Sequence, residues 1–148
     1  LPIKRPALEA AVCKSIAENT VTVIKASSGQ GKTTLALQAA YLLQDKYTPY
    51  QLLCCDDIKE AGNIIQYFHA RIRLGEEVLI LIDNLDNHFN KWNNLVQLLQ
   101  SEVHCHYKLL ITTRENDWYN YSGDLSNIHS IKVVKPTLDE KEAMERRC

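Results

Sequence analysis

The chain has 148 residues, of which 45% are hydrophobic, and a formal net charge of −1 at pH 7. This length and composition fit one globular domain with a core of its own. No apolar run approaches the roughly 20 residues needed to cross a bilayer, and no cluster of Lys and Arg marks a nucleic-acid-binding face, so neither a membrane nor a direct nucleic-acid partner is expected.

The first part of the chain predicts a helix, a strand and a second helix. The first helix is expected from Pro6 to near Asn19, and the strand over Val21–Ala26, whose near-continuous apolar character is typical of a strand buried on both faces. The second helix is expected over Thr33–Asp45. Three apolar residues are expected to form its inward stripe: Leu35, Ala39 and Leu42.

The middle of the chain repeats this alternation. The segment 46–49 contains a proline and is expected to break the second helix before a strand over Tyr50–Cys55. Asp57, with Glu60 three residues later, predicts a capped helix N-terminus. Apolar residues then follow at helical spacing: Ile58, Ala61, Ile65, Phe68 and Ile72. The most apolar strand is expected over Val78–Asp83.

The last part predicts a helix over 92–103, strands over Tyr107–Thr112 and Ser130–Val134, and a capping box at 137–140 that begins another helix. Strands that alternate with helices at this spacing favour right-handed βαβ units and a mainly parallel sheet, so the fold class is α/β. Ligands of such sheets bind at the carboxyl ends of the strands, and the candidate functional residues lie at those ends.

The segment Ala26–Thr34 has the pattern of a phosphate-binding loop between a strand and a helix. Its glycines let successive N–H groups point at one anion, and the helix N-terminus adds further N–H groups and a partial positive charge. Lys32 is expected to reach the β- and γ-phosphates, and the Thr33 hydroxyl to ligate Mg²⁺. Besides these two, the candidate nucleotide-binding residues of the loop are Ser28, Gly29, Gln30, Gly31 and Thr34.

The strand over Val78–Asp83 ends in a carboxylate, which is the Walker B pattern. Asp83 is expected at the ligand edge of the sheet, where it accepts a magnesium-bound water and completes the metal site that Thr33 begins. Many hydrolytic P-loop proteins place a glutamate next, but this chain has Asn84, which cannot act as a base. Either Asp86 orients the attacking water or hydrolysis is slow.

The strand over Tyr107–Thr112 is followed by Thr113 and Arg114. If this strand adjoins the phosphate-loop strand, Arg114 is aimed at the γ-phosphate. A guanidinium there could distinguish ATP from ADP by pairing with the terminal phosphate oxygens.

Three segments together, Ala26–Thr34, Leu81–Asp86 and Thr112–Arg114, resemble the STAND class of signal-transduction ATPases, which includes the NACHT and NB-ARC groups of immune receptors and bacterial relatives. Lys135–Ala143 also resembles the segment that opens the helical domain of these proteins. Arg5, before the first helix, is similar to the arginine-bearing segment that lines their adenine pocket.

The resemblance implies a three-layer P-loop NTPase core with a mainly parallel five-stranded sheet and helices on both faces. Residues 1–135 are then the nucleotide-binding domain, and 136–148 begin a truncated helical domain. Implied cofactors are ATP or ADP and Mg²⁺. The implied function is a switch in which slow, Mg²⁺-dependent ATP hydrolysis controls self-association of the full-length protein and an effector of immune or defence type; an ATPase is expected, although its rate stays open.

Two other functions remain open. Small-molecule kinases also begin with a phosphate loop, but they usually carry an arginine-rich lid, and the segment 84–92 contains no arginine. A binding module that never hydrolyses its nucleotide is the second alternative, which Asn84 favours.

The compartment and the ends of the chain are also expectations. The five cysteines include no C-x-x-C pair and leave one over, which together with the nucleotide motif favours reduced thiols in a cytoplasmic protein. The sequence begins without Met and stops at Cys148 within a helical pattern, so it is expected to be a fragment.

Overall fold

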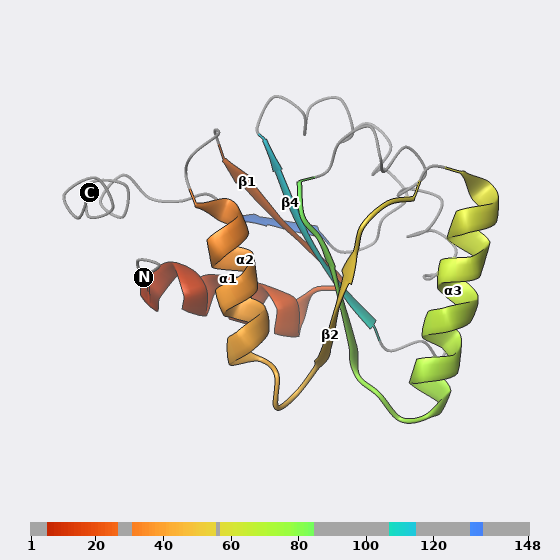
Figure 1. Ribbon diagram of the computed structural model, residues 1–148. Coiled ribbons are helices and arrows are strands. Elements are labelled where there is room, and N and C mark those ends of the chain that lie inside the picture. Colours follow the sequence, from red (N-terminus) through yellow and green to blue (C-terminus); the bar gives the residue numbers. More distant parts are fainter. Residues whose placement is uncertain (1–5, 27–30, 56, 85–106, 115–130, 135–148) are drawn as a thin grey trace.

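The computed structural model (Figure 1) describes residues 6–26, 31–55, 57–84, 107–114 and 131–134. Within these ranges helices and strands alternate as far as residue 82, and two further strands follow. The elements are α1 (Pro6–Glu18), β1 (Val21–Ala26), α2 (Lys32–Leu42), β2 (Thr48–Leu52), α3 (Ile58–Arg73), β3 (Val78–Ile82), β4 (Tyr107–Arg114) and β5 (Ile131–Val134). None of the described helices is both long and apolar enough to span a bilayer.

The strands pair in parallel in the order β2-β3-β4-β1-β5. This order inserts β4 between β1 and β3, so the ends of these three strands lie next to one another at the carboxyl edge of the sheet. The register places Ala26 beside Arg114 and Ile82 beside Ile111. The predicted α/β fold with a parallel sheet is confirmed.

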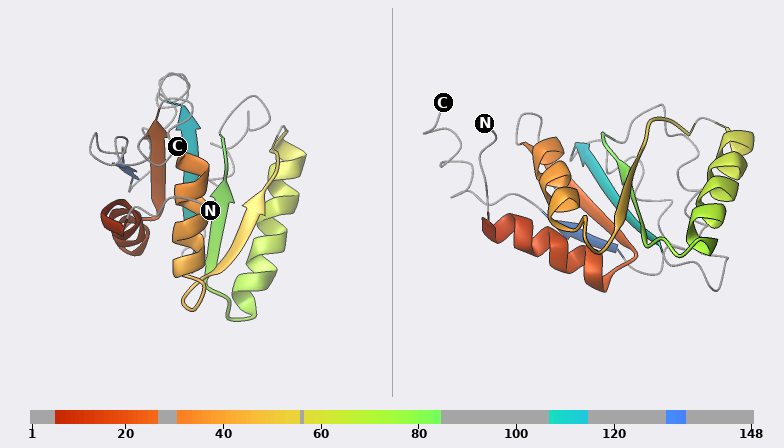
Figure 2. Two further views of the ribbon diagram at one scale, coloured as in Figure 1. Left: turned by 60° about the vertical axis from the view of Figure 1, so that its left-hand side comes forward. Right: turned by 60° about the horizontal axis from the view of Figure 1, so that its bottom comes forward.

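Side chains of the central strands point alternately to two apolar clusters. In β3, Val78 and Ile80 belong to the cluster that contains the buried residues of α3, whereas Leu79 belongs to the cluster that contains those of α1 and α2. Figure 1 shows α3 on one side of the strands and α1 and α2 on the other, and Figure 2 gives two further views. Because these strands are buried on both faces, they read as continuous apolar runs in the sequence.

The described helices, α1, α2 and α3, match predicted ones, with corrections to their ends and their buried residues. The helix α2 ends at Leu42, three residues before Asp45, and the side chain of Leu42 is 55% exposed. The predicted inward position of Leu42 is therefore wrong: Ala36 and Ala40 are buried with Leu35 and Ala39, and this rotates the buried stripe away from Leu42.

The helix α3 has its predicted cap, and one of the apolar residues at helical spacing is exposed. The Asp57 side chain accepts a hydrogen bond of 2.8 Å from the Glu60 backbone N–H, as the sequence predicts. Ile58 is in phase with the buried stripe but is 64% exposed, because it is the first residue of the helix and burial begins one turn later, at Ala61.

The strand β2 begins and ends earlier than predicted. The segment 46–49, which was expected to separate the second helix from this strand, does so only in its first half. Thr48 and Pro49 belong to the strand, and the turn occupies residues 43–46. Pro49 is tolerated because β2 ends the strand order and pairs with β3, and proline, which lacks an N–H group, is found on edge strands.

The strands that bear the candidate site differ slightly from their predicted ranges. β3 ends at Ile82, so Asp83 directly follows it, and β4 continues two residues beyond Thr112. The helix predicted over 92–103, the capping box at 137–140 and the domain boundary at 135 lie outside the described residues.

Candidate functional site

The N-terminus of α2 places two of the predicted site residues. Gly31 is the N-cap residue and has φ 73° and ψ 27°, a left-handed conformation that glycine adopts without strain. Lys32 is the first residue of the helix and is buried, whereas the next side chain, Thr33, is exposed. The first turn contains no acidic residue, so its N–H groups and partial positive charge suit an anion.

The carboxylate of Asp83 joins α2 to the sheet. The Thr33 hydroxyl donates a hydrogen bond to Asp83 Oδ1 at 2.9 Å, although 50 residues separate the two in sequence. The Thr112 hydroxyl donates to the same oxygen at 2.6 Å. Both bonds are charge-assisted, and the shorter has the length typical of a hydroxyl on a carboxylate. The predicted pair of Thr33 and Asp83 is thus brought into direct contact.

Thr112 belongs to the Thr112–Arg114 segment named in the sequence, which gave it no role of its own, yet the structure brings it into contact with Asp83. Its hydroxyl also accepts a hydrogen bond of 2.7 Å from the backbone N–H of Asn84, whose φ is 62°. Asparagine tolerates this left-handed conformation better than most residues. The sequence does show a polar residue after an apolar run at this position. It could be placed beside Asp83 only once the strand order showed that β4 adjoins β3.

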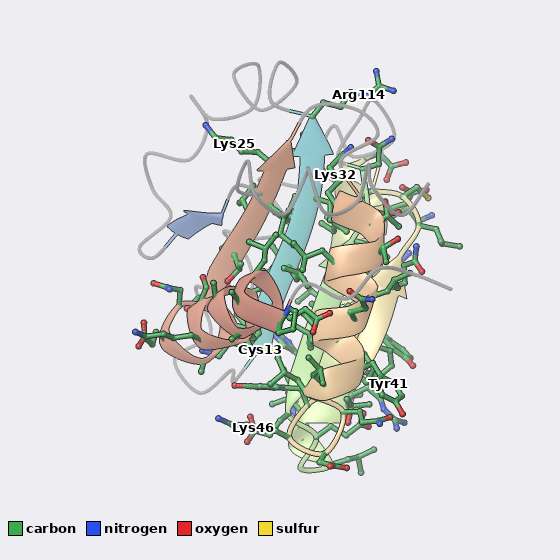
Figure 3. The ribbon with its side chains drawn as sticks, turned by 90° about the vertical axis from the view of Figure 1, so that its left-hand side faces the viewer. Cys13, Lys25, Lys32, Tyr41, Lys46 and Arg114 are labelled. Atoms are coloured by element: carbon green, nitrogen blue, oxygen red, sulfur yellow. The ribbon has the colours of Figure 1, made fainter. Side chains whose placement is uncertain are left out.

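Basic side chains gather at the carboxyl edge of the sheet. Lys25, Lys32 and Arg114 lie at this end of the molecule, whereas Lys46 lies at the opposite end (Figure 3). Arg114 is exposed, and its backbone pairs with that of Ala26, the first residue of the phosphate-loop segment. Arg114 was expected to face the γ-phosphate if its strand adjoins the phosphate-loop strand, and β4 does pair with β1. Positive charge here complements a polyphosphate.

The residues present fit a magnesium ion that also binds a nucleotide. A hydroxyl and a carboxylate are the hard oxygen ligands that Mg²⁺ prefers, and Mg²⁺ is usually held by one or two protein groups together with waters and substrate phosphates. Thr33 and Asp83 supply such a pair. Among the described residues, no group of three or more His, Cys, Asp or Glu side chains suited to a metal occurs.

Of the remaining predicted site residues, only Thr34 lies in the described part of the chain. Thr34 is half-buried in the first turn of α2. Five residues lie outside the part of the chain that the structure describes: Arg5, Ser28, Gly29, Gln30 and Asp86.

Comparisons with known proteins agree with this geometry. A family model described as Novel STAND NTPase 5 matches residues 2–126. The chain is also similar to a solved structure, "Structure of Rhizobiales Trip13", with a TM-score of 0.56 and 18% identity over 93% of this chain and 53% of that one. At this identity the likeness concerns the fold, and the chain spans about half the length of that protein. No curated protein matches. Because the family model covers most of the sequence, the resemblance to STAND-class P-loop NTPases is confirmed: the chain belongs to the Novel STAND NTPase 5 family.

Proposed function

We propose that this chain is the ATP- and ADP-binding switch core of a signal-transduction ATPase. The observation that carries the proposal is the hydrogen bond between Thr33 and Asp83. It joins the first turn after the phosphate loop to the end of the Walker B strand, which is where a magnesium ion would meet both groups. Membership of a STAND NTPase family supports the same function.

Each residue of the site has a separate proposed task. The Lys32 ammonium binds the β- and γ-phosphates, and the N–H groups at the start of α2 bind the same anion. Thr33 and Asp83 hold Mg²⁺, which supplies charge neutralisation to the phosphates when bound. Arg114, at the end of β4, pairs with the terminal phosphate and so distinguishes ATP from ADP.

Hydrolysis is proposed to be slow. Asn84 follows Asp83 and has an exposed amide side chain, which cannot take a proton from water. Asp86 is the proposed residue that orients the water. A slow reaction suits a protein that uses its nucleotide state as a signal, because the ATP-bound state then persists long enough to be read.

The larger organisation is also proposed. Residues 1–135 form a three-layer core with a five-stranded sheet, and residues 136–148 begin a helical domain. In the full-length protein, ADP holds a closed monomer, and exchange for ATP permits self-association and activation of an effector of immune or defence type.

The first experiment is thermal unfolding with Mg-ATP, Mg-ADP and Mg-GTP. A nucleotide at 100 times its dissociation constant stabilises the folded state by about 2.7 kcal/mol, which raises the Tm by several degrees. We expect this shift with adenine nucleotides and not with GTP. It should vanish in Lys32→Ala and persist in the control Lys59→Ala, because Lys59 is an exposed residue of α3.

Two outcomes would contradict the proposal. Absence of a shift with any nucleotide in the wild-type protein argues against a nucleotide site. A shift that survives in Lys32→Ala places the nucleotide elsewhere. Release of phosphate from ATP, lowered in Asp86→Asn, separates a slow ATPase from a module that never hydrolyses, and phosphate transfer to a small acceptor would indicate a kinase.

A further inference from the structure

The buried hydroxyl of Thr112 links three parts of the site. The side chain is fully buried at the carboxyl end of β4, which lies between β1 and β3. It donates to Asp83 Oδ1 and accepts from the Asn84 N–H. We propose that Thr112 is a positioning residue, which fixes the Asp83 carboxylate in the orientation that magnesium binding requires. This inference rests on the proposed function, because it concerns the same metal site.

The direction of the two hydrogen bonds is determined by their partners. A backbone N–H can only donate, so Asn84 engages a lone pair of the Thr112 oxygen. The single hydroxyl proton is then committed to Asp83. Hydrogen bonds in such a chain strengthen one another, because each polarises the next. The Thr112 hydroxyl therefore cannot rotate without losing both partners.

The two hydrogen bonds to Asp83 determine which of its carboxylate oxygens faces the magnesium site. Thr33 and Thr112 approach Asp83 from different elements, α2 and β4, and both donate to Oδ1. Within the described part of the chain, no hydrogen bond engages Oδ2. Two donors on one oxygen fix the rotation of the carboxylate, and the lone pairs of Oδ2 are left for a water on the metal.

Thr112 is well suited to hold this geometry. A β-branched side chain has few χ1 rotamers, and a strand with a neighbour on each side moves little. The same hydroxyl also holds the left-handed turn at Asn84. One buried hydroxyl thus aligns both Asp83, which directly follows β3, and the next residue, Asn84.

The chain offers a matched control in the next residue. Thr113 is also fully buried in β4, but successive side chains of a strand point to opposite faces. Its hydroxyl donates to the Arg114 backbone carbonyl at 3.3 Å. Thr113→Val therefore removes a buried hydroxyl from the same strand without touching Asp83.

The test compares Thr112→Val, Thr112→Ser and Thr113→Val in the purified protein. Binding of a fluorescent ATP analogue is titrated with Mg²⁺ and is measured separately in EDTA. Loss of a group that orients a metal ligand typically weakens metal affinity 10- to 100-fold. We expect Thr112→Val to need about tenfold more Mg²⁺, with unchanged binding in EDTA. Thr112→Ser should restore the wild-type Mg²⁺ dependence, and Thr113→Val should keep it.

Amide hydrogen exchange gives a second readout that needs no nucleotide. The Asn84 amide should exchange faster in Thr112→Val, which removes its acceptor, and stay protected in Thr112→Ser and Thr113→Val. Unchanged exchange in Thr112→Val would overturn the inference. So would equal weakening of nucleotide binding with and without Mg²⁺, since that result indicates general damage.

Failure of the proposed function has a different signature. If the wild-type protein binds the ATP analogue equally well in Mg²⁺ and in EDTA, the magnesium site itself is refuted, and the role of Thr112 with it. If the wild-type protein depends on Mg²⁺ and Thr112→Val retains the same dependence, only the role of Thr112 is refuted.

Discussion

Arg114 and Lys32 present two kinds of positive charge to the same edge of the sheet. Lys32 is a buried residue in the first turn of α2, whereas Arg114 is an exposed residue at the end of β4. A lysine held next to the loop suits the β-phosphate, which ATP and ADP share, as well as the γ-phosphate of ATP. An exposed guanidinium suits a group that is present only in ATP, because it can move to meet the terminal phosphate.

Replacing Arg114 by Ala should reduce the preference for ATP over ADP. Hydrogen bonds to a charged group are worth about 1.5–3 kcal/mol, so we expect ATP binding to weaken about tenfold or more while ADP binding is retained. Competition of each nucleotide against a fluorescent analogue measures both affinities. Arg73→Ala, at an exposed position of α3, is the control. Equal weakening of ATP and ADP binding in Arg114→Ala would refute a sensing role.

The sequence indicated the candidate residues whose spacing forms a motif, but gave no role to Thr112, whose contact with Asp83 depends on strand order. Lys32, Thr33 and Asp83 could be predicted, because the loop and the Walker B strand each have a recognisable pattern. The contact between Thr33 and Asp83 followed from the carboxyl-edge rule. Thr112 could not be assigned, since one sequence does not say which strand adjoins Asp83.

At the scale of single elements, the edge strand β2 is fastened to α3 by one polar network. The Tyr50 hydroxyl donates to the Glu76 carboxylate, and Arg71 Nε donates to the same hydroxyl at 3.1 Å. Arg71 also forms an ion pair with Glu76. The Tyr50 ring packs edge-on against Tyr67 and Phe68 of α3.

This network is predicted to add to the free energy of unfolding, and the added stability should disappear at alkaline pH. The hydrogen bond to Glu76 is the main cause that raises the pKa of Tyr50 above its ordinary value of 10.0, and burial adds to it, while Arg71 opposes it. A raised pKa means that folding favours the protonated phenol. The stabilisation is therefore fully present below pH 10.0 and is lost as the pH rises through the pKa of the folded state.

Urea unfolding of the wild-type protein and of Tyr50→Phe between pH 8 and about 11.5 measures this added stability. The phenylalanine keeps the ring contacts, and other titrating groups cancel in the difference between the two proteins. We expect a constant difference in the free energy of unfolding below pH 10.0, which shrinks at higher pH. A difference that is absent at pH 8, or that persists unchanged through the alkaline range, would contradict the prediction.

The boundaries of β2 show why element ends were harder to predict than elements. Pro49 is a typical breaker in sequence, but an edge strand tolerates it, and the edge position follows only from the order of the described strands. The bounds of β1 matched the prediction, because a doubly buried strand is apolar along its length and the loop motif marks its end. The predicted strand ran to Cys55, but β2 ends at Leu52; beyond it Cys54 is exposed and Cys55 is buried.

At the scale of the whole molecule, the sheet separates two apolar clusters with different relations to the site. One cluster contains the buried residues of α1 and α2, and α2 carries Lys32 and Thr33 at its N-terminus. The other contains those of α3. Packing under α2 therefore supports both the fold and the phosphate-binding geometry, whereas packing under α3 supports the fold.

Leu109 and Leu110 separate these two contributions, because they are adjacent in β4, fully buried, and belong to different clusters. Replacing either leucine by Ala should lower the free energy of unfolding by about 2–5 kcal/mol, measured by urea unfolding. Leu110 packs in the cluster of α2, so the cavity left by Leu110→Ala loosens the support of the helix that holds Lys32. We expect Leu110→Ala to weaken nucleotide binding more than Leu109→Ala does, at a temperature where both variants are folded. Equal affinities in two equally destabilised variants would contradict this coupling and would mean that the site depends on the stability of the whole sheet, irrespective of which face is disturbed.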